Sequence, residues 1–391
     1  VHTAVKIDPV YSGPVLHVND ASRSVPVAGA LLSGSSAPEL LEKYDADYDR
    51  IREQHHRSVG ADKFIPINEA RNNSFRIDWE ASPPKKSGFI GVKVFKDFPL
   101  NEIAEYIDWT PFFHSWELKG SYPRILKDER VGSEAQKLFN DAKQMLQKLL
   151  ESGSIKASGV IGIFRANAVD DDIQLYTDES GDTPLCTFHT IRQQSKKPEG
   201  KPNLALSDFV APVGYEDHVG AFAVTCGQGV EELAKEYEAA HDDYNSIMVK
   251  ALADRLAEAF AELMHKKVRR ELWGYASDES LSNEELINES YSGIRPAPGY
   301  PAQPDHTEKL TLFKLLDVEN NIGVKLTESM AMWPAASVSG LYFSHPSAHY
   351  FGTGKVQEDQ VKDYAERKGM ALDEAEKWLS PVLSYDPVQT S

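Results

Sequence analysis

The sequence predicts a mixed α+β fold, and three features of the chain support this prediction. Apolar residues recur with helical spacing at residues 133–150 and again at residues 231–273. Short apolar runs bounded by turn residues, which are typical of strands, occur between these segments. The strands do not alternate regularly with helices, and no phosphate-binding glycine fingerprint follows a strand, so a doubly wound nucleotide-binding fold is not expected.

The amino-terminal elements come first in this prediction. Residues 14–18 indicate a short buried strand, followed by a turn at Asn19 and Asp20 and a helix that could begin at residues 21–25. The segment 33–38 is rich in serine, glycine and proline and interrupts the pattern, and residues 39–56 then form a highly charged helical pattern. We therefore interpret residues 33–58 as a linker that leads into a solvated helix.

Most of the regular structure is expected after residue 58. A second break at residues 81–86 contains two prolines and two lysines, and residues 89–95 then predict a strand. Three further strands are expected, at residues 159–164, 172–176 and 220–224. No internal repeat is apparent, so residues 59–391 are interpreted as one large domain.

Composition limits the classes of partner. The chain has 391 residues, of which 41% are hydrophobic and 26% charged, which is enough for a large buried core. Its formal net charge of −18 argues against nucleic acid and against anionic membranes, because both attract a positive field. No apolar run is long enough to span a bilayer, and no cleavable leader is apparent, so a soluble, cytoplasmic protein is expected.

Neither the cysteines nor the histidines form a site by spacing. Cys186 and Cys226 are too few for a disulfide framework or a thiolate metal site, and both are expected to be buried thiols. A nucleophilic role for Cys226 stays open, although no histidine lies near it in the sequence. His306 lacks a partner at metal-ligand spacing, and residues 170–172, three aspartates, fit a solvated turn better than a calcium loop. No catalytic residue and no metal site is predicted.

The most informative segment is Gly-Ile-Arg-Pro-Ala-Pro-Gly-Tyr-Pro at residues 293–301. Three prolines and two glycines stiffen it, and neither a helix interior nor a central strand would accommodate them. The segment is suited to presenting the Arg295 side chain, the Ala297 backbone and the Tyr300 ring to a bound group. A tight structural connection explains the same residue types about equally well.

This segment occurs together with three other uncommon strings. They are Tyr-Ile-Asp-Trp-Thr-Pro-Phe-Phe at residues 106–113, the helix-like stretch 241–262, and residues 326–344. Together, and in this order from about residue 51 to about residue 387, they resemble the activation domain of cobalamin-dependent methionine synthase. The resemblance implies a single C-shaped domain with a mainly antiparallel sheet flanked by helices.

The resemblance also implies domain boundaries. Residues 1–32 are similar to the end of the cobalamin-binding module that precedes the activation domain in the family, and the chain starts at Val1 in mid-pattern, so a fragment of a longer protein is expected. The family's Asp-x-His-x-x-Gly signature for the lower cobalt ligand is absent, as are the cysteine zinc site and the homocysteine and folate modules. The chain is therefore not expected to bind the zinc of the full-length enzyme or to complete its main reaction alone.

The resemblance further implies a site for S-adenosylmethionine. From the sequence alone Asp108 is best explained as a helix cap, but the family position implies that it receives the amino group of the ligand. Arg295 would bind the ligand carboxylate through its planar fork, where the alternative is a surface ion pair. Gly299, with Ala297, would offer backbone groups and room for the nucleoside, and Tyr300 a wall.

Two more regions are implied at the site. Tyr350 and Phe351 match a family position that closes over the ligand, although ordinary core packing explains paired aromatic residues as well. Asp254, Glu258 and Glu262 share one face of the helix expected from Asp242, and most such stripes are solvated. We expect Glu258 beside the ligand and Asp254 at a docking surface.

The expected function follows from the family. The domain would bind S-adenosylmethionine and support the reductive methylation of cob(II)alamin to methylcobalamin, which reactivates methionine synthase in methionine biosynthesis. The expected partners are the cobalamin-binding module of the same protein and a flavodoxin-like or diflavin reductase electron donor. Such donors are acidic, so a local basic patch is expected, for which residues 266–270 are candidates. The alternative is a sensing or docking module that does not itself promote methyl transfer.

Overall fold

The computed structural model describes residues 2–18, 21–33, 36–58, 63–178, 180–181 and 183–387. The expected turn at Asn19 and Asp20, residues 34–35 of the expected linker, and residues 59–62 at the expected domain start lie outside this part of the chain. The chain separates into two compact units, Val1–Ile65 and Pro66–Ser391. Each unit is described by itself.

The first unit is helical. It contains the π-helix η1 (Thr3–Ile7), the 3-10 helix η2 (Asp8–Val10), and the α-helices α1 (Ala21–Leu32) and α2 (Ala37–Ser58). Arg52 connects α2 to η1 and η2, because its Nη1 donates hydrogen bonds to the Ala4 carbonyl of η1 at 2.9 Å and to Asp8 Oδ2 of η2 at 2.7 Å. The helices expected from residues 21–25 and 39–56 are confirmed.

The strand expected at residues 14–18 is wrong. This segment has no regular secondary structure, and its His17 N–H donates to the Tyr48 hydroxyl at 2.9 Å. A strand requires a neighbouring strand for its backbone hydrogen bonds. No described segment of the first unit pairs with residues 14–18. These residues therefore form no strand, although their apolar pattern is typical of one.

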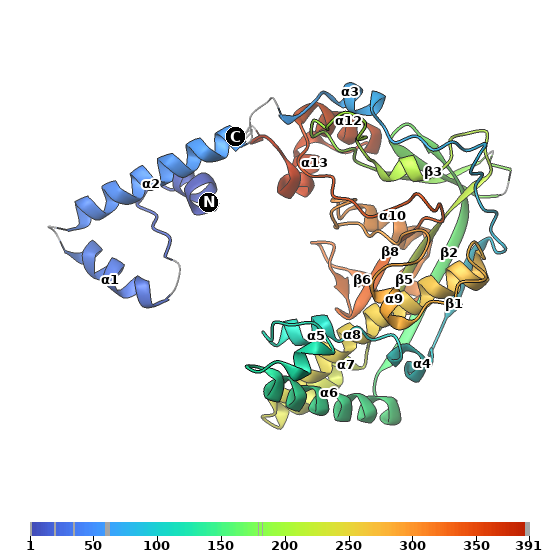
Figure 1. Ribbon diagram of the computed structural model, residues 1–391, viewed down its shortest axis with the longest axis horizontal. Helices are drawn as coiled ribbons and strands as arrows, with labels where there is room; N and C mark the ends of the chain where they lie inside the picture. Colours follow the sequence, from blue (N-terminus) through green and yellow to red (C-terminus); the bar gives the residue numbers. More distant parts are fainter. Residues whose placement is uncertain are drawn as a thin grey trace. The chain divides into compact units, whose positions relative to one another are not determined.

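The second unit is built on an antiparallel sheet with the strand order β4-β3-β2-β5-β8, and β1 pairs with one end of β2 (Figure 1). The fourteen-residue β2 is long enough for β1 and β3 to share one of its edges while β5 occupies the other. The strands are β1 (Gly91–Phe95), β2 (Lys156–Val169), β3 (Asp172–Tyr176), β4 (Pro184–His189), β5 (Asp217–Gln228) and β8 (Ser337–Tyr342). This arrangement confirms the α+β fold with a mainly antiparallel sheet.

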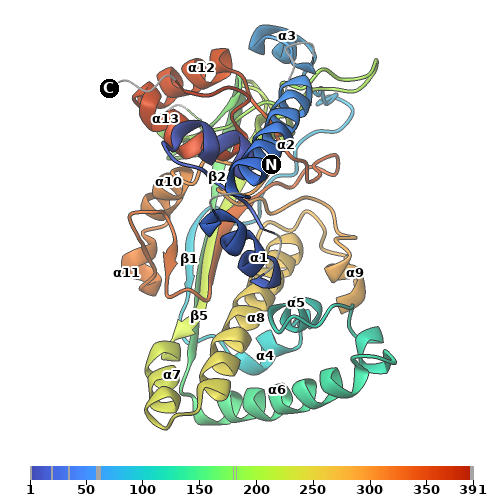
Figure 2. The same cartoon turned by 90° about the vertical axis from the view of Figure 1, so that its left-hand side faces the viewer.

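Helices surround this sheet. In chain order, the helices up to residue 239 are α3 (Ile67–Asn72), α4 (Leu100–Ala104), α5 (Thr110–Ser115), η4 (Arg124–Lys127), α6 (Gly132–Ser152), η5 (Leu206–Phe209) and α7 (Val230–Ala239). Those that follow are α8 (Asp243–Lys267), the π-helix η6 (Val268–Leu272), α9 (Asn283–Ile287), α10 (Glu308–Leu315), α11 (Val318–Ile322), α12 (Glu358–Lys368), α13 (Leu372–Leu379) and η7 (Ser380–Val382). The short strands β6 (Lys325–Leu326) and β7 (Met332–Trp333) pair separately. Within this unit, α4 to α7 gather at one end of the long strands, and α3, α12 and α13 at the other (Figures 1 and 2).

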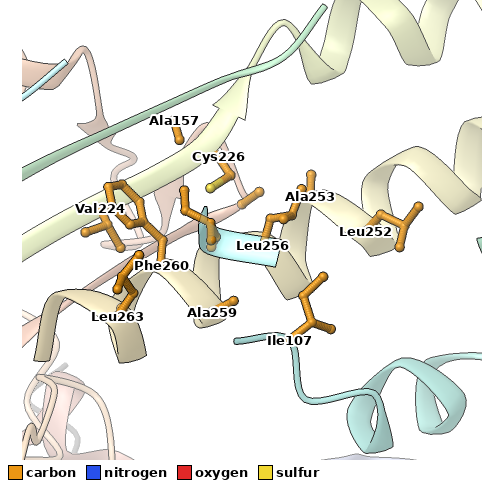
Figure 3. Packing of buried hydrophobic residues seen from close by; sticks show 14 of the residues in the cluster. Ile107, Ala157, Val224, Cys226, Leu252, Ala253, Leu256, Ala259, Phe260 and Leu263 are labelled. Atoms are coloured by element: carbon orange, nitrogen blue, oxygen red, sulfur yellow. The ribbon is translucent and has the colours of Figure 1, made fainter. Parts of the chain in front are cut away.

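Helix α8 positions the residues that matter below. It begins after Asp242, whose carboxylate accepts a hydrogen bond from the Asn245 N–H at 3.1 Å and so caps the helix. The apolar side chains of Leu252, Leu256 and Phe260 recur every four residues and belong to one core cluster together with residues of β2 and β5 (Figure 3). Their burial fixes the rotation of α8 about its axis.

The acidic residues of α8 lie on its other side. Glu258 and Glu262 each follow a core residue by two positions, which corresponds to about 200° around a helix. Once Leu256 and Phe260 are buried against the sheet, these carboxylates must therefore lie away from it. Glu262 is nevertheless only 8% exposed, so other elements cover it.

Several predicted elements are confirmed with small changes in their ends. The helix expected at residues 133–150 is α6, and the strands expected at residues 89–95, 159–164, 172–176 and 220–224 lie in or overlap β1, β2, β3 and β5. The single pattern at residues 231–273 is divided into α7, α8 and η6, because His241 adopts a positive φ of 58° between α7 and α8.

Two expectations about local environment need correction. A solvated turn at residues 170–172 is wrong for Asp171, which is 1% exposed and accepts hydrogen bonds from Arg71 and Arg192. It is also wrong for Asp172, which is buried and lies 3.0 Å from His189 Nδ1. Their arginine and histidine partners come from distant parts of the chain, which the local sequence does not reveal.

The cysteines differ from each other. Cys226 is fully buried as expected, and burial raises the pKa of its thiol, whereas Cys186 is only partly buried and has a pKa raised to about 12, chiefly by burial. Burial thus favours the protonated form of both thiols over the thiolate. Within the described ranges, no group of three or more His, Cys, Asp or Glu residues could hold a metal ion, and no helix is both long and apolar enough to cross a membrane.

Candidate functional site

The proline-rich segment 293–301 is attached to the edge of the sheet. Strand β8 ends the strand order, and Ile294 and Phe343 exchange two backbone hydrogen bonds of 3.0 Å each just beyond its end. The Leu341 N–H then donates to the Pro296 carbonyl at 2.8 Å. Proline can accept such a bond without a donor of its own, so the segment covers the edge of β8 without extending the sheet further.

Two glycines make this path possible. Gly293 has φ +82°, and a Cβ there would lie 2.3 Å from the Phe343 carbonyl oxygen. Gly299 has φ +93°, donates its N–H to the Gln303 carbonyl at 2.7 Å, and would place a Cβ 2.2 Å from the His306 ring. Only glycine tolerates both constraints at these positions. His306 thus packs against a turn, and its Nδ1 lies 3.1 Å from Lys309 Nζ.

A cavity of about 470 Å³ opens beside this segment. Six of the eight residues predicted for the site line it: Glu258, Arg295, Ala297, Tyr300, Tyr350 and Phe351. They come from α8, the proline-rich segment and the segment after β8. The apolar side chains of Phe222 and Val338 form part of the wall, which makes this cavity suitable for an organic ligand with an apolar portion.

A second cavity, of about 280 Å³, contains the seventh predicted residue, Asp108. It shares Glu258, Glu289 and Arg295 with the first cavity, so the two adjoin at these residues. We call the two cavities together the ligand groove. The groove therefore has an aromatic part near Tyr350 and an acidic part near Asp108, with Arg295 between them.

Asp108 combines the two interpretations that its sequence context allowed. It lies one residue before Trp109, the N-cap of α5, and its Oδ1 accepts the N–H of Thr110, the first residue of that helix, at 2.9 Å, while the same side chain lines the groove. Among the described residues no donor to Oδ2 is recorded, so this oxygen is available to a ligand. The hydrogen bond to Thr110 would hold the carboxylate in place for that purpose.

Gly299 is the one predicted residue that lines neither cavity. Its backbone N–H is already used within the turn. Its role in the structure is to shape the segment that carries Arg295 and Tyr300. The carbonyl of Ala297 is likewise used, since it accepts the Tyr300 N–H at 3.1 Å.

Arg295 is partly buried, with 20% of its side chain exposed, and only some of its donors are hydrogen-bonded. Its Nη2 donates to Glu262 Oε2 at 2.9 Å, and its backbone N–H donates to the Tyr350 hydroxyl at 3.0 Å. Burial disfavours the charged guanidinium, but attraction to Glu262 and neighbouring groups outweighs burial and raises the pKa of Arg295. Its Nε is buried without a hydrogen-bond partner, as is the Ser339 hydroxyl in the same groove. Buried donors of this kind are normally satisfied, and these two belong to residues that line the cavity, where a ligand can bond them.

The charges of the groove favour a particular kind of ligand. Asp108, Glu258, Glu262 and Glu289 supply four carboxylates, while Arg255 and Arg295 supply two cations. Burial raises the pKa of Glu289, with Arg295 opposing this shift and Glu262 reinforcing it. A ligand that carries positive charge as well as one carboxylate for Arg295 would balance this environment.

Some residues of the groove were not expected from the sequence. Tyr106 and Ser339 lie in the uncommon strings 106–113 and 326–344 but were not predicted as site residues, and Glu289, which follows α9 with a positive φ of 55°, carried no distinctive local signal. Glu262 was noted on the acidic face of α8, but its pairing with Arg295 depends on a contact across thirty-three positions of sequence. Asp254 is exposed and lines neither cavity, and its docking role stays a prediction.

The basic run at residues 266–270 needs a correction. Arg269 is fully buried, and its guanidinium is bonded to Glu279, so it cannot belong to an exposed patch. Lys266 donates to the Tyr106 hydroxyl at 3.0 Å, and it lies with Lys267 in the last turn of α8. This position favours cations because of the partial negative charge at a helix carboxyl terminus.

Comparison with known proteins identifies the family of this chain. The family model described as "Vitamin B12 dependent methionine synthase, activation domain" matches residues 99–369, which is more than half of the chain. A crystal structure of the MetH reactivation domain bound to AdoHcy is similar to this chain with a TM-score of 0.81 and 55% sequence identity, over 83% of this chain and 100% of the other. This chain belongs to the family of activation domains of vitamin B12-dependent methionine synthase.

Proposed function

We propose that the ligand groove binds S-adenosylmethionine and that the domain supports reductive methylation of cobalamin, which reactivates methionine synthase. The observation that carries this proposal is the position of Arg295 between an acidic cavity and an aromatic one. The methionine part of the ligand has a carboxylate, an amino group and a sulfonium cation, and its adenosine part needs apolar walls. The groove offers a partner of the right kind for each.

The size and unpaired groups of the groove support this assignment. Cavities of 300–1,000 Å³ are typical for small ligands, and the larger cavity has about 470 Å³ before the adjoining 280 Å³ is added. In addition, Arg295 Nε and Ser339 Oγ are buried donors without partners. The relative at 55% identity is bound to AdoHcy, which is S-adenosylmethionine without its transferable methyl group.

Each side chain has a role in this proposal. Arg295 would bind the ligand carboxylate through its unused donors, and Asp108 would accept a hydrogen bond from the ligand amino group through Oδ2. Tyr300, Tyr350 and Phe351 would contact the nucleoside. Glu258 lies at the junction of the two cavities and would stabilise the sulfonium charge electrostatically.

The chain contributes positioning and charge to the reaction. When a reduced cobalamin is presented to the groove, its cobalt supplies the nucleophile for the sulfonium methyl group. The side chains around Arg295 would hold the ligand so that this methyl group is accessible, and the Tyr300 ring, which is 62% exposed, marks the open side of the groove. This role requires no acid or base catalyst.

The proposal includes partners and a location. The cobalamin would be held by the cobalamin-binding module, of which residues 1–32 would be the end, followed by a linker at 33–58 and the activation domain from 59. A flavodoxin-like or diflavin reductase would supply the electron. The reductive chemistry fits a reducing compartment, so we place the protein in the cytoplasm.

Calorimetric titration with S-adenosylmethionine tests the binding site. We expect saturable one-to-one binding, with competition by AdoHcy, and loss of binding in Asp108→Asn and Arg295→Ala variants whose folding is verified by circular dichroism. Absence of binding to the folded wild-type chain would refute the site. Methylation of a supplied cobalamin module under reducing conditions then distinguishes methyl transfer from a domain that only senses the ligand.

A further inference from the structure

A row of alternating charges extends from the ligand groove into the protein. Arg295 is bonded to Glu262, Glu262 Oε1 lies 3.8 Å from Arg269 Nη1, and Arg269 binds both oxygens of Glu279 at 2.8 Å. The side chain of Arg269 is 0% exposed, that of Glu279 is 7% exposed and that of Glu262 is 10% exposed. Two cations and two anions thus balance each other behind the groove.

The fold places these residues firmly. Glu262 lies near the end of α8, and Arg269 follows seven positions later in η6, so both occupy the same side of the helical segment. The loop that carries Glu279 is attached to this segment, because the Ala276 N–H donates to the Arg269 carbonyl at 2.9 Å. The Tyr291 ring covers the Arg269 guanidinium, with 4.3 Å between the guanidinium carbon and the ring centre.

The hydrogen bonds in this row are complete between Arg269 and Glu279 and incomplete between Arg269 and the groove. Arg269 and Glu279 form a two-point pair, the strongest geometry available to arginine. By contrast, Glu262 Oε1, Arg269 Nη1 and Arg295 Nε are buried without hydrogen-bond partners. Glu262 therefore occupies one donor of Arg295 and leaves its Nε unused, beside a cavity sized for a ligand.

We propose that Glu262 is a positioning residue that fixes the guanidinium of Arg295 for the ligand carboxylate, and that Arg269 and Glu279 in turn hold Glu262. This inference rests on the proposed binding of S-adenosylmethionine. An arginine side chain has several rotatable bonds, and a single hydrogen bond that it donates to the Glu262 carboxylate restricts much of that freedom before the ligand arrives. The ligand then meets an oriented guanidinium.

Glu262 also has an opposite electrostatic effect. Its negative charge lies next to the arginine that would bind an anion, so on charge alone its removal should strengthen binding of a carboxylate. Positioning predicts the reverse, a weaker interaction. Removal of Glu262 should therefore raise the affinity for the ligand carboxylate if the charge effect dominates and lower it if positioning dominates. The experiment must isolate the contribution of that carboxylate.

The experiment measures the dissociation constants of S-adenosylmethionine and of its decarboxylated form, which lacks only the group that Arg295 would bind. The ratio of the two constants reports the carboxylate interaction. For Glu262→Ala we expect affinity for S-adenosylmethionine to fall about tenfold and affinity for the decarboxylated form to change little, the size expected for a lost hydrogen bond to a charged group. A Glu262→Gln variant keeps the shape and one hydrogen-bond acceptor. Its affinity for S-adenosylmethionine should therefore fall only about threefold, and the ratio of the two dissociation constants should change less than in Glu262→Ala.

Two further variants complete the test. Glu279→Gln weakens the support of Arg269 at a distance from the groove and should lower the ratio less than Glu262→Ala does. Glu271→Gln is the matched control, because Glu271 is exposed on the same helical segment and pairs only with Lys267 among the described residues. Its ratio should equal that of the wild-type chain.

The outcomes are distinct. Unchanged or tighter binding of S-adenosylmethionine in Glu262→Ala would overturn the positioning role, and so would an equal loss for both ligands, which indicates general damage to the fold. If Glu262→Ala does not fold, the ratio in Glu262→Gln decides by the same criteria. A wild-type chain that binds neither ligand would refute the proposed function itself.

Discussion

Two groups of arginines in the second unit differ in how many of their hydrogen-bond donors have partners. The first group is the Arg192 cluster, which consists of Arg192, Asp171 and Asp208, with Arg71 and Asp363 on its outside. Arg192 donates hydrogen bonds of 2.7 to 2.8 Å from Nε to Asp171 and from both Nη atoms to Asp208. In the ligand groove, Arg295 donates one side-chain bond and leaves Nε without a partner. We therefore expect disruption of the satisfied cluster to destabilise the fold, and loss of the partly unsatisfied Arg295 to act on the proposed ligand binding.

The largest expected effect concerns the Arg192 cluster. Arg192→Ala would leave Asp171 and Asp208 buried without their main cation, so we expect the free energy of unfolding to fall by about 3–5 kcal/mol. Denaturant unfolding followed by circular dichroism measures this change. The matched control is Lys362→Ala, which removes only an exposed pair with Glu358 and should leave stability unchanged. Equal stability of the two variants would contradict the structural role of the cluster.

The next effect concerns Arg295 and should appear in affinity. Arg295→Ala removes the proposed partner of the ligand carboxylate, and we expect the affinity for S-adenosylmethionine to fall about 100-fold, since a charge-assisted pair is lost in a buried site. Calorimetric titration measures the affinity. The free energy of unfolding should change less than in Arg192→Ala, because Glu262 keeps Arg269 as a neighbour. A variant that binds the ligand normally would exclude Arg295 from the site.

A change of pH should also separate the two regions. Burial raises the pKa of Glu289 in the groove, so this carboxylate becomes neutral at a higher pH than an ordinary glutamate and loses its attraction for a cationic ligand. Burial opposes ionisation of Asp363 too, but hydrogen bonds from Arg71 and Arg367 outweigh it and lower its pKa. Between pH 7 and about pH 5, affinity should therefore fall while the contribution of Asp363 to stability persists.

The signs of these two contributions are opposite. The stabilising contribution of Asp363 is present above its unfolded pKa and is lost only as pH falls through the lower folded pKa. Glu289, with its raised folded pKa, contributes stability at low pH and loses that contribution as pH rises, so acidification does not destabilise the fold through this group. Calorimetry at pH 7 and pH 5, with Glu289→Gln as the control that should lose part of the pH dependence, tests the prediction. Affinity that is equal at both values would contradict it.

The smallest effect compares two serines of β8. The Ser337 hydroxyl donates to the Pro334 carbonyl at 2.7 Å, whereas the Ser339 hydroxyl is buried in the groove without a partner. Ser337→Ala should lower the free energy of unfolding by about 1 kcal/mol with no change in affinity. Ser339→Ala should leave stability unchanged and weaken ligand binding by about threefold if its hydroxyl bonds the ligand. The reverse pattern in unfolding and titration experiments would remove Ser339 from the site.

Regular elements with strong periodicity could be predicted from the sequence. Helix α6 was expected because its apolar residues repeat with the helical period and face one core. The central strands β2 and β5 were expected because they are apolar runs, which the structure buries on both faces between two core clusters. Strands β4 and β8 were not, because β4 lies at an edge of the sheet and is partly exposed, and β8 contains serine and glycine at positions that pack closely on neighbours. Short strands of this kind are recognised only once their partners are in place.

The site shows the same division. Its Arg-Pro-Ala-Pro-Gly-Tyr-Pro segment is distinctive enough to indicate the family and to propose Arg295 from the sequence. That Gly299 serves the turn, that Glu262 holds Arg295, and that Glu289 lines both cavities all depend on contacts between distant segments. The sequence by itself determined the fold class, the family and the residue types of the site. Tertiary structure alone decided which charged groups have all their partners and which keep unpaired donors beside a cavity, because burial and pairing depend on what every other segment covers.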